Sequence, residues 1–256
     1  MTAKFKKMRT AGVVPPDYDG PVYWRVMQYH LVSGASDEPI AFTDDPARLD
    51  RLWIDWNKMP GKSIFTSGTV FDEDGAILPE WKQPIKAKWT KPGPVRVEYS
   101  PGRYSARVSE RVLDAIESVE PGRHHVFPID VRCTDGTIER RYQIFFAQDA
   151  FVDGIEAHPV ANALEPLPKP VGVYRFRPPT WLYAFDIDED QFGYLDRSVV
   201  GGMRWFKGTA TNHYFSPDLF SKLRPMGNIF PKWDVALPIG MAADPPNLDP
   251  LSQGYA

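Results

Sequence analysis

The sequence predicts a strand-rich α+β fold, with mostly antiparallel sheets and about three short helices. Proline is frequent, at 26 of 256 residues, and it interrupts both helix interiors and central strands. Aromatic residues make up 13% of the chain and include 8 Trp, and they favour strands. Many short strands joined by turns are therefore expected rather than long helices.

The composition is that of a globular protein that needs neither a metal nor a disulfide to build its core. The chain is 43% hydrophobic and 25% charged, and its length allows one large domain or two small ones. The net charge is −3, and neither half has the charge of a nucleic-acid-binding surface. Cys133, the single cysteine, lies in an alternating run and is expected to be a small buried hydrophobe.

Nothing in the sequence predicts export or membrane insertion. The basic residues near the N-terminus are followed by too few apolar residues for a signal peptide. No uncharged apolar stretch approaches the ~18 residues of a membrane span. With one cysteine an internal disulfide is impossible, so an oxidising compartment is not indicated. We expect a cytoplasmic protein that contacts neither membranes nor nucleic acid.

The N-terminal half is expected to contain an arm at 1–20 and a β-rich subdomain at 21–105. A long strand is predicted over Val22–Val32, where β-branched and aromatic residues are dense. Asp45-Pro46 is a typical helix start, and apolar residues then recur at helical spacing as far as Trp56. Further short strands are predicted around Ser63–Val70, Ile77–Leu78 and Val95–Tyr99.

An α+β domain is expected over 106–238, either separate from the β-rich subdomain or continuous with it. Ser109 is the predicted cap of a helix with an apolar face, and Pro121-Gly122 ends that helix. The clearest hairpin of the sequence follows, because two alternating runs, Val126–Cys133 and Thr137–Phe146, flank a Thr-Asp-Gly turn.

A proline-rich crossing at 158–170 leads to the last predicted elements. A third helix is expected from Ser216-Pro217, and a closing strand near Ile229–Val235. Residues 239–256 show little periodicity and are expected to form a loose tail. Strands are also predicted at Val171–Arg177, Trp181–Ile187 and Val199–Phe206.

The second and third predicted helices share a pattern. From Ser109 and from Ser216, apolar residues fall at the same offsets of 3, 4 and 7. Each helix ends at a Pro/Gly pair and precedes a Phe-Pro segment, Val126-Phe127-Pro128 or Ile229-Phe230-Pro231. Two related helix-to-strand units would have this pattern, and so would any two capped helices that lead into strands. Both interpretations stay open at this point.

No catalytic, metal-binding or cofactor motif is recognised, and no such site is expected. Gly61-Lys62-Ser63 lacks the first glycine and the following helix of a phosphate-binding loop. Asp186, Asp188 and Asp190 have the spacing of a calcium loop, but the turn glycine and the bidentate acid are missing. The five histidines and the cysteine show no zinc-site spacing.

Two segments resemble a bacterial family of immunity proteins from polymorphic toxin systems, the eleventh family in the usual numbering and once a domain of unknown function. One comprises Val108–Ile116, Pro121-Gly122 and Val126–Val131. The other is similar to the family's closing pattern, in which a strand leads into a capped helix and a short final strand. It comprises Trp205, Phe215–Leu219, Leu223 and Ile229-Phe230. The resemblance covers roughly residues 95–235, and the first 60 residues match only in general style.

The resemblance implies a cytoplasmic antidote, not an enzyme. Such a protein binds one cognate toxin domain and blocks its active site or the access of its substrate. The family offers no catalytic motif to carry over. If the toxin is basic, as a nuclease would be, acidic residues of this chain are expected to contact it. The candidate toxin-binding residues are Asp186, Asp188, Glu189 and Asp190.

Two other functions stay open from the sequence. A small-molecule enzyme would gather Arg175, Arg177, His213 and the acids of the 186–190 turn in one cleft, with strongly shifted pKa values. An adaptor that carries a toxin to its secretion machinery would bind the toxin without neutralising it.

Overall fold

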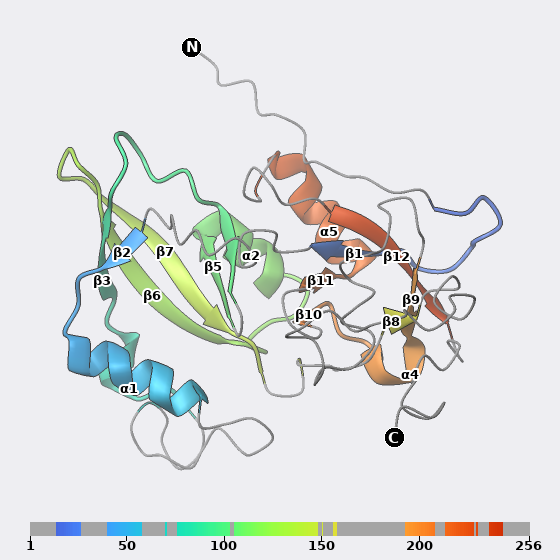
Figure 1. The fold of residues 1–256 in the computed structure, drawn as a ribbon, viewed down its shortest axis with the longest axis horizontal. Coiled ribbons are helices and arrows are strands. Elements are labelled where there is room, and N and C mark those ends of the chain that lie inside the picture. Colours follow the sequence, from blue (N-terminus) through green and yellow to red (C-terminus); the bar gives the residue numbers. More distant parts are fainter. Residues whose placement is uncertain are drawn as a thin grey trace, which may run out of the picture. The chain divides into compact units, whose positions relative to one another are not determined.

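The protein has a mixed α+β fold with two curled, mostly antiparallel sheets of six strands each (Figure 1). Three helices among the described residues have seven residues or more: α1 (Pro46–Asn57), α2 (Glu110–Glu117) and α5 (Pro217–Leu223). The predicted fold class is confirmed. The computed structural model describes residues 14–26, 40–57, 70, 76–102, 105–147, 150, 156–157, 193–207, 213–227, 229 and 236–242.

The chain divides into two compact units. The central unit comprises 30–149 and 229–231, and the terminal unit comprises 1–29, 150–228 and 232–256. No helix in the described part of the chain combines the length and the apolar character that a membrane span requires.

The sheet of the central unit has the strand order β2-β3-β6-β7-β5-β4. Neighbouring strands are antiparallel, except that β3 and β6 are parallel. The bounds are β2 (Ile40–Phe42), β3 (Ile85–Trp89), β4 (Tyr99–Pro101), β5 (Ser105–Ser109), β6 (His125–Arg132) and β7 (Ile138–Phe145).

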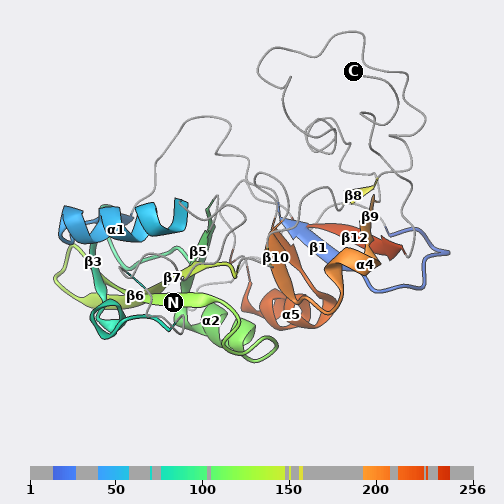
Figure 2. The same cartoon turned by 90° about the horizontal axis from the view of Figure 1, so that it is seen from below.

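Helices cover both faces of this sheet, with α1 and α2 on opposite sides of β6 and β7 (Figure 2). On the α1 face, the short helix η2 (Pro79–Lys82) buries Trp81 edge-on against Phe127, with ring centroids 6.2 Å apart. Arg48 of α1 lies 5.0 Å from the same indole. On the α2 face, α2 packs against β5 and β7. Burial, together with the nearby Glu110 carboxylate, raises the pKa of Tyr142 of β7. The core of the unit therefore lies on both sides of the sheet.

Local signals account for the correctly predicted elements of the central unit. The Asp45 carboxylate accepts the Ala47 N–H at 3.0 Å, so α1 begins at its expected cap. The hairpin of β6 and β7 closes where the Cys133 N–H donates to Thr137 at 2.8 Å. Gly136 has φ +87° there, a conformation that favours glycine. Cys133 is buried, as expected.

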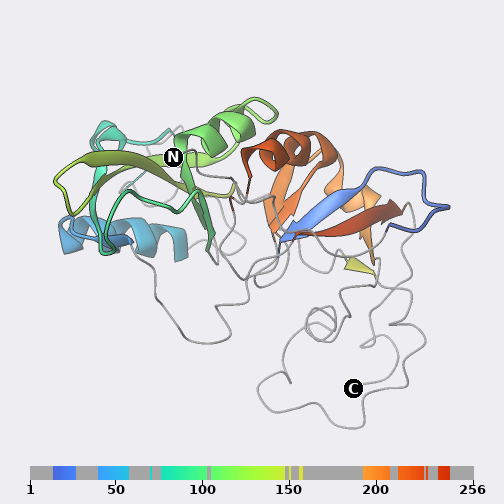
Figure 3. The same cartoon turned by 90° about the horizontal axis from the view of Figure 1, so that it is seen from above.

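The terminal unit has the strand order β10-β11-β1-β12-β9-β8. Its strand β1 (Tyr23–Val26) lies between two strands from the other end of the chain, and it is seen beside β12 in Figure 3. Trp24 of β1 stacks on Phe220 of α5 at 4.3 Å. The remaining strands are β8 (Glu156–Ala157), β9 (Gly193–Asp196), β10 (Trp205–Lys207), β11 (His213–Phe215) and β12 (Ala236–Ala242).

The two sheets match strand for strand. In the order β4-β5-β7-β6-β3-β2 and in the order β10-β11-β1-β12-β9-β8, only the fourth pair is parallel. Five of the six strands also follow the same sequence along the chain. The exception is the third position, which β7 fills in the central unit and β1 fills in the terminal unit.

The register agrees to the residue. In the central unit Tyr142 lies between Val108 and Pro128, and in the terminal unit Trp24 lies between Phe215 and Pro238. The next residues after Val108 and Phe215 are Ser109 and Ser216, which precede α2 and α5. The shared helix pattern of the sequence therefore reflects two related βαβ units.

The strand register shows that the Phe-Pro segment predicted after the third helix is not the counterpart of the one after the second. The counterpart of Phe127-Pro128-Ile129 is Leu237-Pro238-Ile239, not Phe230-Pro231, because Pro128 and Pro238 hold the same position opposite the central strand. The strand with this role is Ala236–Ala242, and of the predicted closing strand at 229–235 only Ile229 is among the described residues, where it belongs to no strand. The last four residues of β12 occupy the start of the predicted tail at 239–256.

Other predictions differ from the structure near the sheet ends. The first two residues of the strand expected at Val199–Phe206 belong instead to α4 (Arg197–Val200), which Asp196 caps by accepting the Ser198 N–H at 2.8 Å. Only the end of that predicted strand belongs to β10. Strand β4 begins at Tyr99, where the predicted strand at Val95–Tyr99 ends.

The other predicted boundaries lie partly within and partly outside the described residues. β4 and β5 pair across the domain boundary suggested between residues 105 and 106. The predicted strand over 22–32 is described as far as Val26. The following predictions lie outside the described residues: the strands at 63–69, 171–177 and 181–187, and the crossing at 158–170.

Candidate functional site

The residues that the sequence favours for toxin binding lie outside the described part of the chain. They are Asp186, Asp188, Glu189 and Asp190. Arg175 and Arg177 of the enzyme hypothesis lie outside it too. His213, the histidine of that hypothesis, is fully buried in β11, with its ring 6.4 Å from the Trp205 ring. The structure therefore encloses His213 among core residues instead of presenting it to solvent.

The buried Arg141 joins strand β7 to the loop before β4. The Arg141 guanidinium donates to the carbonyl oxygens of Val95 at 2.9 Å and Val97 at 3.2 Å, and to the Glu139 carboxylate at 3.0 Å. The other Glu139 oxygen accepts the Val95 N–H at 3.0 Å. Because the pair also satisfies backbone groups of the loop, it fixes the loop against the sheet.

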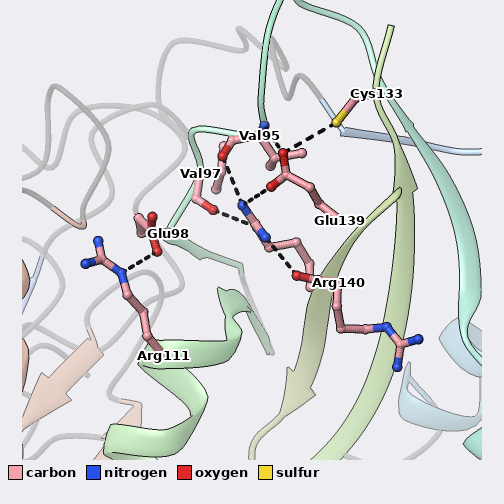
Figure 4. A network of polar contacts seen from close by, with 8 residues as sticks. Val95, Val97, Glu98, Arg111, Cys133, Glu139 and Arg140 are labelled. Atoms are coloured by element: carbon pink, nitrogen blue, oxygen red, sulfur yellow. Dashed lines mark hydrogen bonds and ion pairs between the residues drawn. The ribbon is translucent and has the colours of Figure 1, made fainter. Parts of the chain in front are cut away.

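A second ion pair ties the same loop to α2. Arg111 Nε lies 3.0 Å from Glu98 Oε2 (Figure 4). The Ser109 N–H also donates to the Glu98 carbonyl at 2.9 Å. Burial alone would raise the pKa of Glu98, but the Ser109 hydroxyl and the Arg111 charge outweigh it and lower that pKa. The edge of the central sheet is thus held at two points.

One half of the α2 face of this sheet is open and mostly cationic. Side chains alternate along a strand, so residues two apart share a face. On β3 the buried residues alternate with two exposed lysines, and exposed charged residues follow on the neighbouring β6 and β7. We call this surface the basic face, and it comprises Lys86, Lys88, Asp130, Arg132, Ile138 and Arg140.

The register arranges the basic face in two rows across three strands. The first row is Lys86, Asp130 and Arg140, and the second is Lys88, Arg132 and Ile138. In the first row Arg140 Nε lies 2.8 Å from Asp130 Oδ1, so the carboxylate of this surface pairs with Arg140. The surface therefore has four cations and one anion, and it carries an isoleucine that is 58% exposed.

The basic face was not predicted from the sequence, although the sequence contains part of its pattern. In Ile85–Trp89 apolar residues alternate with Lys86 and Lys88, which is typical of a strand with one basic face. The contributions of Arg132 and Arg140 depend on strand register, which the spacing along the chain does not give.

A histidine at the start of β6 is held neutral. Burial, together with the charge of the neighbouring His124, lowers the pKa of His125 to about 4. His124 is buried as well, and its Nδ1 accepts the Ala147 N–H at 3.2 Å. The pair therefore links the first residues of β6 to the chain that follows β7.

Within the described ranges no group of three His, Cys, Asp or Glu side chains is placed to hold a metal ion. No family model, curated protein or solved structure matches the chain.

Proposed function

We propose that this protein is a cytoplasmic bacterial immunity protein. It binds one cognate toxin domain and neutralises it by covering the active site or the path of the substrate. It acts as a binding protein and not as an enzyme, and it needs no cofactor.

The placement of the resembling segments is the observation that carries this proposal. The first segment runs through β5, α2 and β6, and the second runs from β10 and β11 into α5. Each contains a strand followed by a helix, at matching positions of two matching sheets. The resemblance thus falls on the elements that build each unit.

The central unit also has the properties that a binding protein requires. Its loop at 91–98 is held by buried charge-assisted hydrogen bonds, which keep the surface organised before a partner arrives. Exposed cations surround Ile138, and an apolar anchor with a charged rim is typical of a protein interface.

Co-expression tests the function directly. The toxin candidate is the variable C-terminal domain of a long secreted chain encoded beside this gene. Cells that produce this domain are expected to survive when they also produce the full-length protein, and the two chains should copurify. Absence of rescue would overturn the proposal. Copurification without rescue would instead indicate an adaptor.

The acidic residues at 186–190 are predicted to contact a basic patch on the toxin. Reversal of the charges at Asp186, Asp188, Glu189 and Asp190 is expected to weaken toxin binding. Unchanged binding would discard these four contacts.

A further inference from the structure

We propose that the basic face of the central unit docks an acidic protein surface on the cognate toxin domain. This inference rests on the proposed function, and it assigns that function a second contact surface, opposite in charge to the predicted acidic one.

Uncompensated positive charge is the first argument. Asp130 pairs with Arg140, and within the described part of the chain Lys86, Lys88 and Arg132 form no ion pair. Lys88 and Arg132 even lie directly opposite each other on β3 and β6. Like charges in such a position destabilise a sheet. An acidic partner would relieve this repulsion, so the arrangement favours the bound state.

An exposed apolar side chain is the second argument. Ile138 ends the second row beside Arg132, and its side chain is 58% exposed. The turn that precedes Ile138 is fixed, because the Asp135 carboxylate accepts the Thr137 N–H at 2.9 Å and the Thr137 hydroxyl proton at 2.6 Å. A large apolar residue on a fixed turn, bordered by charges, fits the centre of a protein interface.

These features favour a protein over a nucleic acid. The whole chain has a net charge of −3, which repels a polyanion at long range. Asp130 lies within the basic face, where a phosphate backbone would meet a carboxylate. An acidic protein surface needs only local complementarity, and its apolar residues can contact Ile138.

The terminal unit supplies an internal control. The register places Tyr194 and Asp196 of β9 where the central unit has Lys86 and Lys88, and Gly240 of β12 where it has Asp130. The same scaffold therefore occurs in this chain once with the basic face and once without it.

Two matched pairs of variants test the proposal in the full-length protein. The charge variant Lys86→Glu/Lys88→Glu is compared with Lys222→Glu/Arg224→Glu, which makes the same change in net charge at exposed residues of the terminal unit. The apolar variant Ile138→Ser is compared with Val199→Ser, whose valine is 42% exposed. Binding is measured with the purified C-terminal domain of the neighbouring secreted chain, and each variant is checked for an unchanged unfolding transition.

Both changes to the basic face are expected to weaken binding by at least about tenfold, and the two controls by less than about threefold. Raising the salt concentration should reduce the association rate of the wild-type protein more than that of Lys86→Glu/Lys88→Glu.

Three results would overturn the inference. If wild type and Lys86→Glu/Lys88→Glu both rescue cells and bind equally, the docking surface is wrong while the proposed function stands. If wild type neither binds nor rescues, both fall. If a short DNA duplex binds the basic face at physiological salt and the toxin domain binds elsewhere, the partner class is a nucleic acid.

Discussion

The central and terminal units build the same sheet, but the chain supplies their third strand from different places. In the central unit this strand is β7, which follows β6 through a tight turn. In the terminal unit it is β1, which precedes the rest of the unit by more than the length of the central unit. The same sheet order and register are thus retained although the connection of one strand differs.

The two units differ equally in what they expose. Lys86 and Lys88 correspond by register to Tyr194 and Asp196, and Tyr194 makes an edge contact with Tyr18, at 6.0 Å between ring centroids. The segment that leads into β1 thus contacts this face of the terminal unit, whereas the equivalent residues of the central unit are open. One copy of the scaffold has its face partly occupied by its own chain, and the other keeps it accessible.

The largest expected effect concerns the third strand itself. Arg25 of β1 and Gln143 of β7 hold the same register position, each between two paired strands. Arg25→Pro removes a backbone donor from a central strand and should cost the terminal unit more than about 3 kcal/mol. Hydrogen exchange should show lost protection in 213–215 and 236–242, with 125–132 unaffected.

Gln143→Pro is the matched control and should give the opposite result, with protection lost in the central unit only. If Arg25→Pro left β11 and β12 protected, β1 would not be the third strand of the terminal unit.

A smaller effect should appear when the pH is lowered. The folded pKa of His125, about 4, lies below the ordinary value of 6.5, so the unfolded chain binds this proton first. The stabilisation is complete above pH 6.5 and is lost as the pH falls toward 4. Because the ring is partly exposed, we expect a loss of about 2 kcal/mol, and only in the central unit.

Denaturant unfolding of wild type and His125→Gln between pH 7 and 4, followed by hydrogen exchange of each unit, measures this effect. The His125→Gln variant should show a flatter pH dependence over that range. An identical slope in both proteins would contradict a His125 side chain that the fold holds neutral.

The smallest expected difference separates the two equivalent helix starts. Ser216 accepts the Leu219 N–H at 3.4 Å and donates to the Asp218 carboxylate, whereas the Ser109 side chain makes no cap hydrogen bond. Ser216→Ala should therefore destabilise the protein by about 1 kcal/mol, and Ser109→Ala by less. Thermal unfolding monitored by circular dichroism compares the two variants. Equal losses would show that the helices begin in the same way.

The sequence predicted the elements whose signals are local. Caps and helical spacing identify α1 and α5, and the Thr-Asp-Gly turn identifies the hairpin of β6 and β7. By contrast, β3 was missed although Ile85–Trp89 alternates, because the strand has only five residues, lies between prolines and pairs with β6, which is far along the chain. The basic face was not predicted for the same reason, because Lys88 and Arg132 become neighbours only through the pairing of β3 with β6.

The position of β1 also determines the order in which the units can be completed during synthesis. Strand β1 leaves the ribosome early, but its neighbours β11 and β12 lie more than 180 residues further along the chain. All strands of the central unit are made in between and can pair at once. The terminal sheet closes only when residues 236–242 emerge, so its first strand stays without its neighbours until after the strands of the central unit are complete.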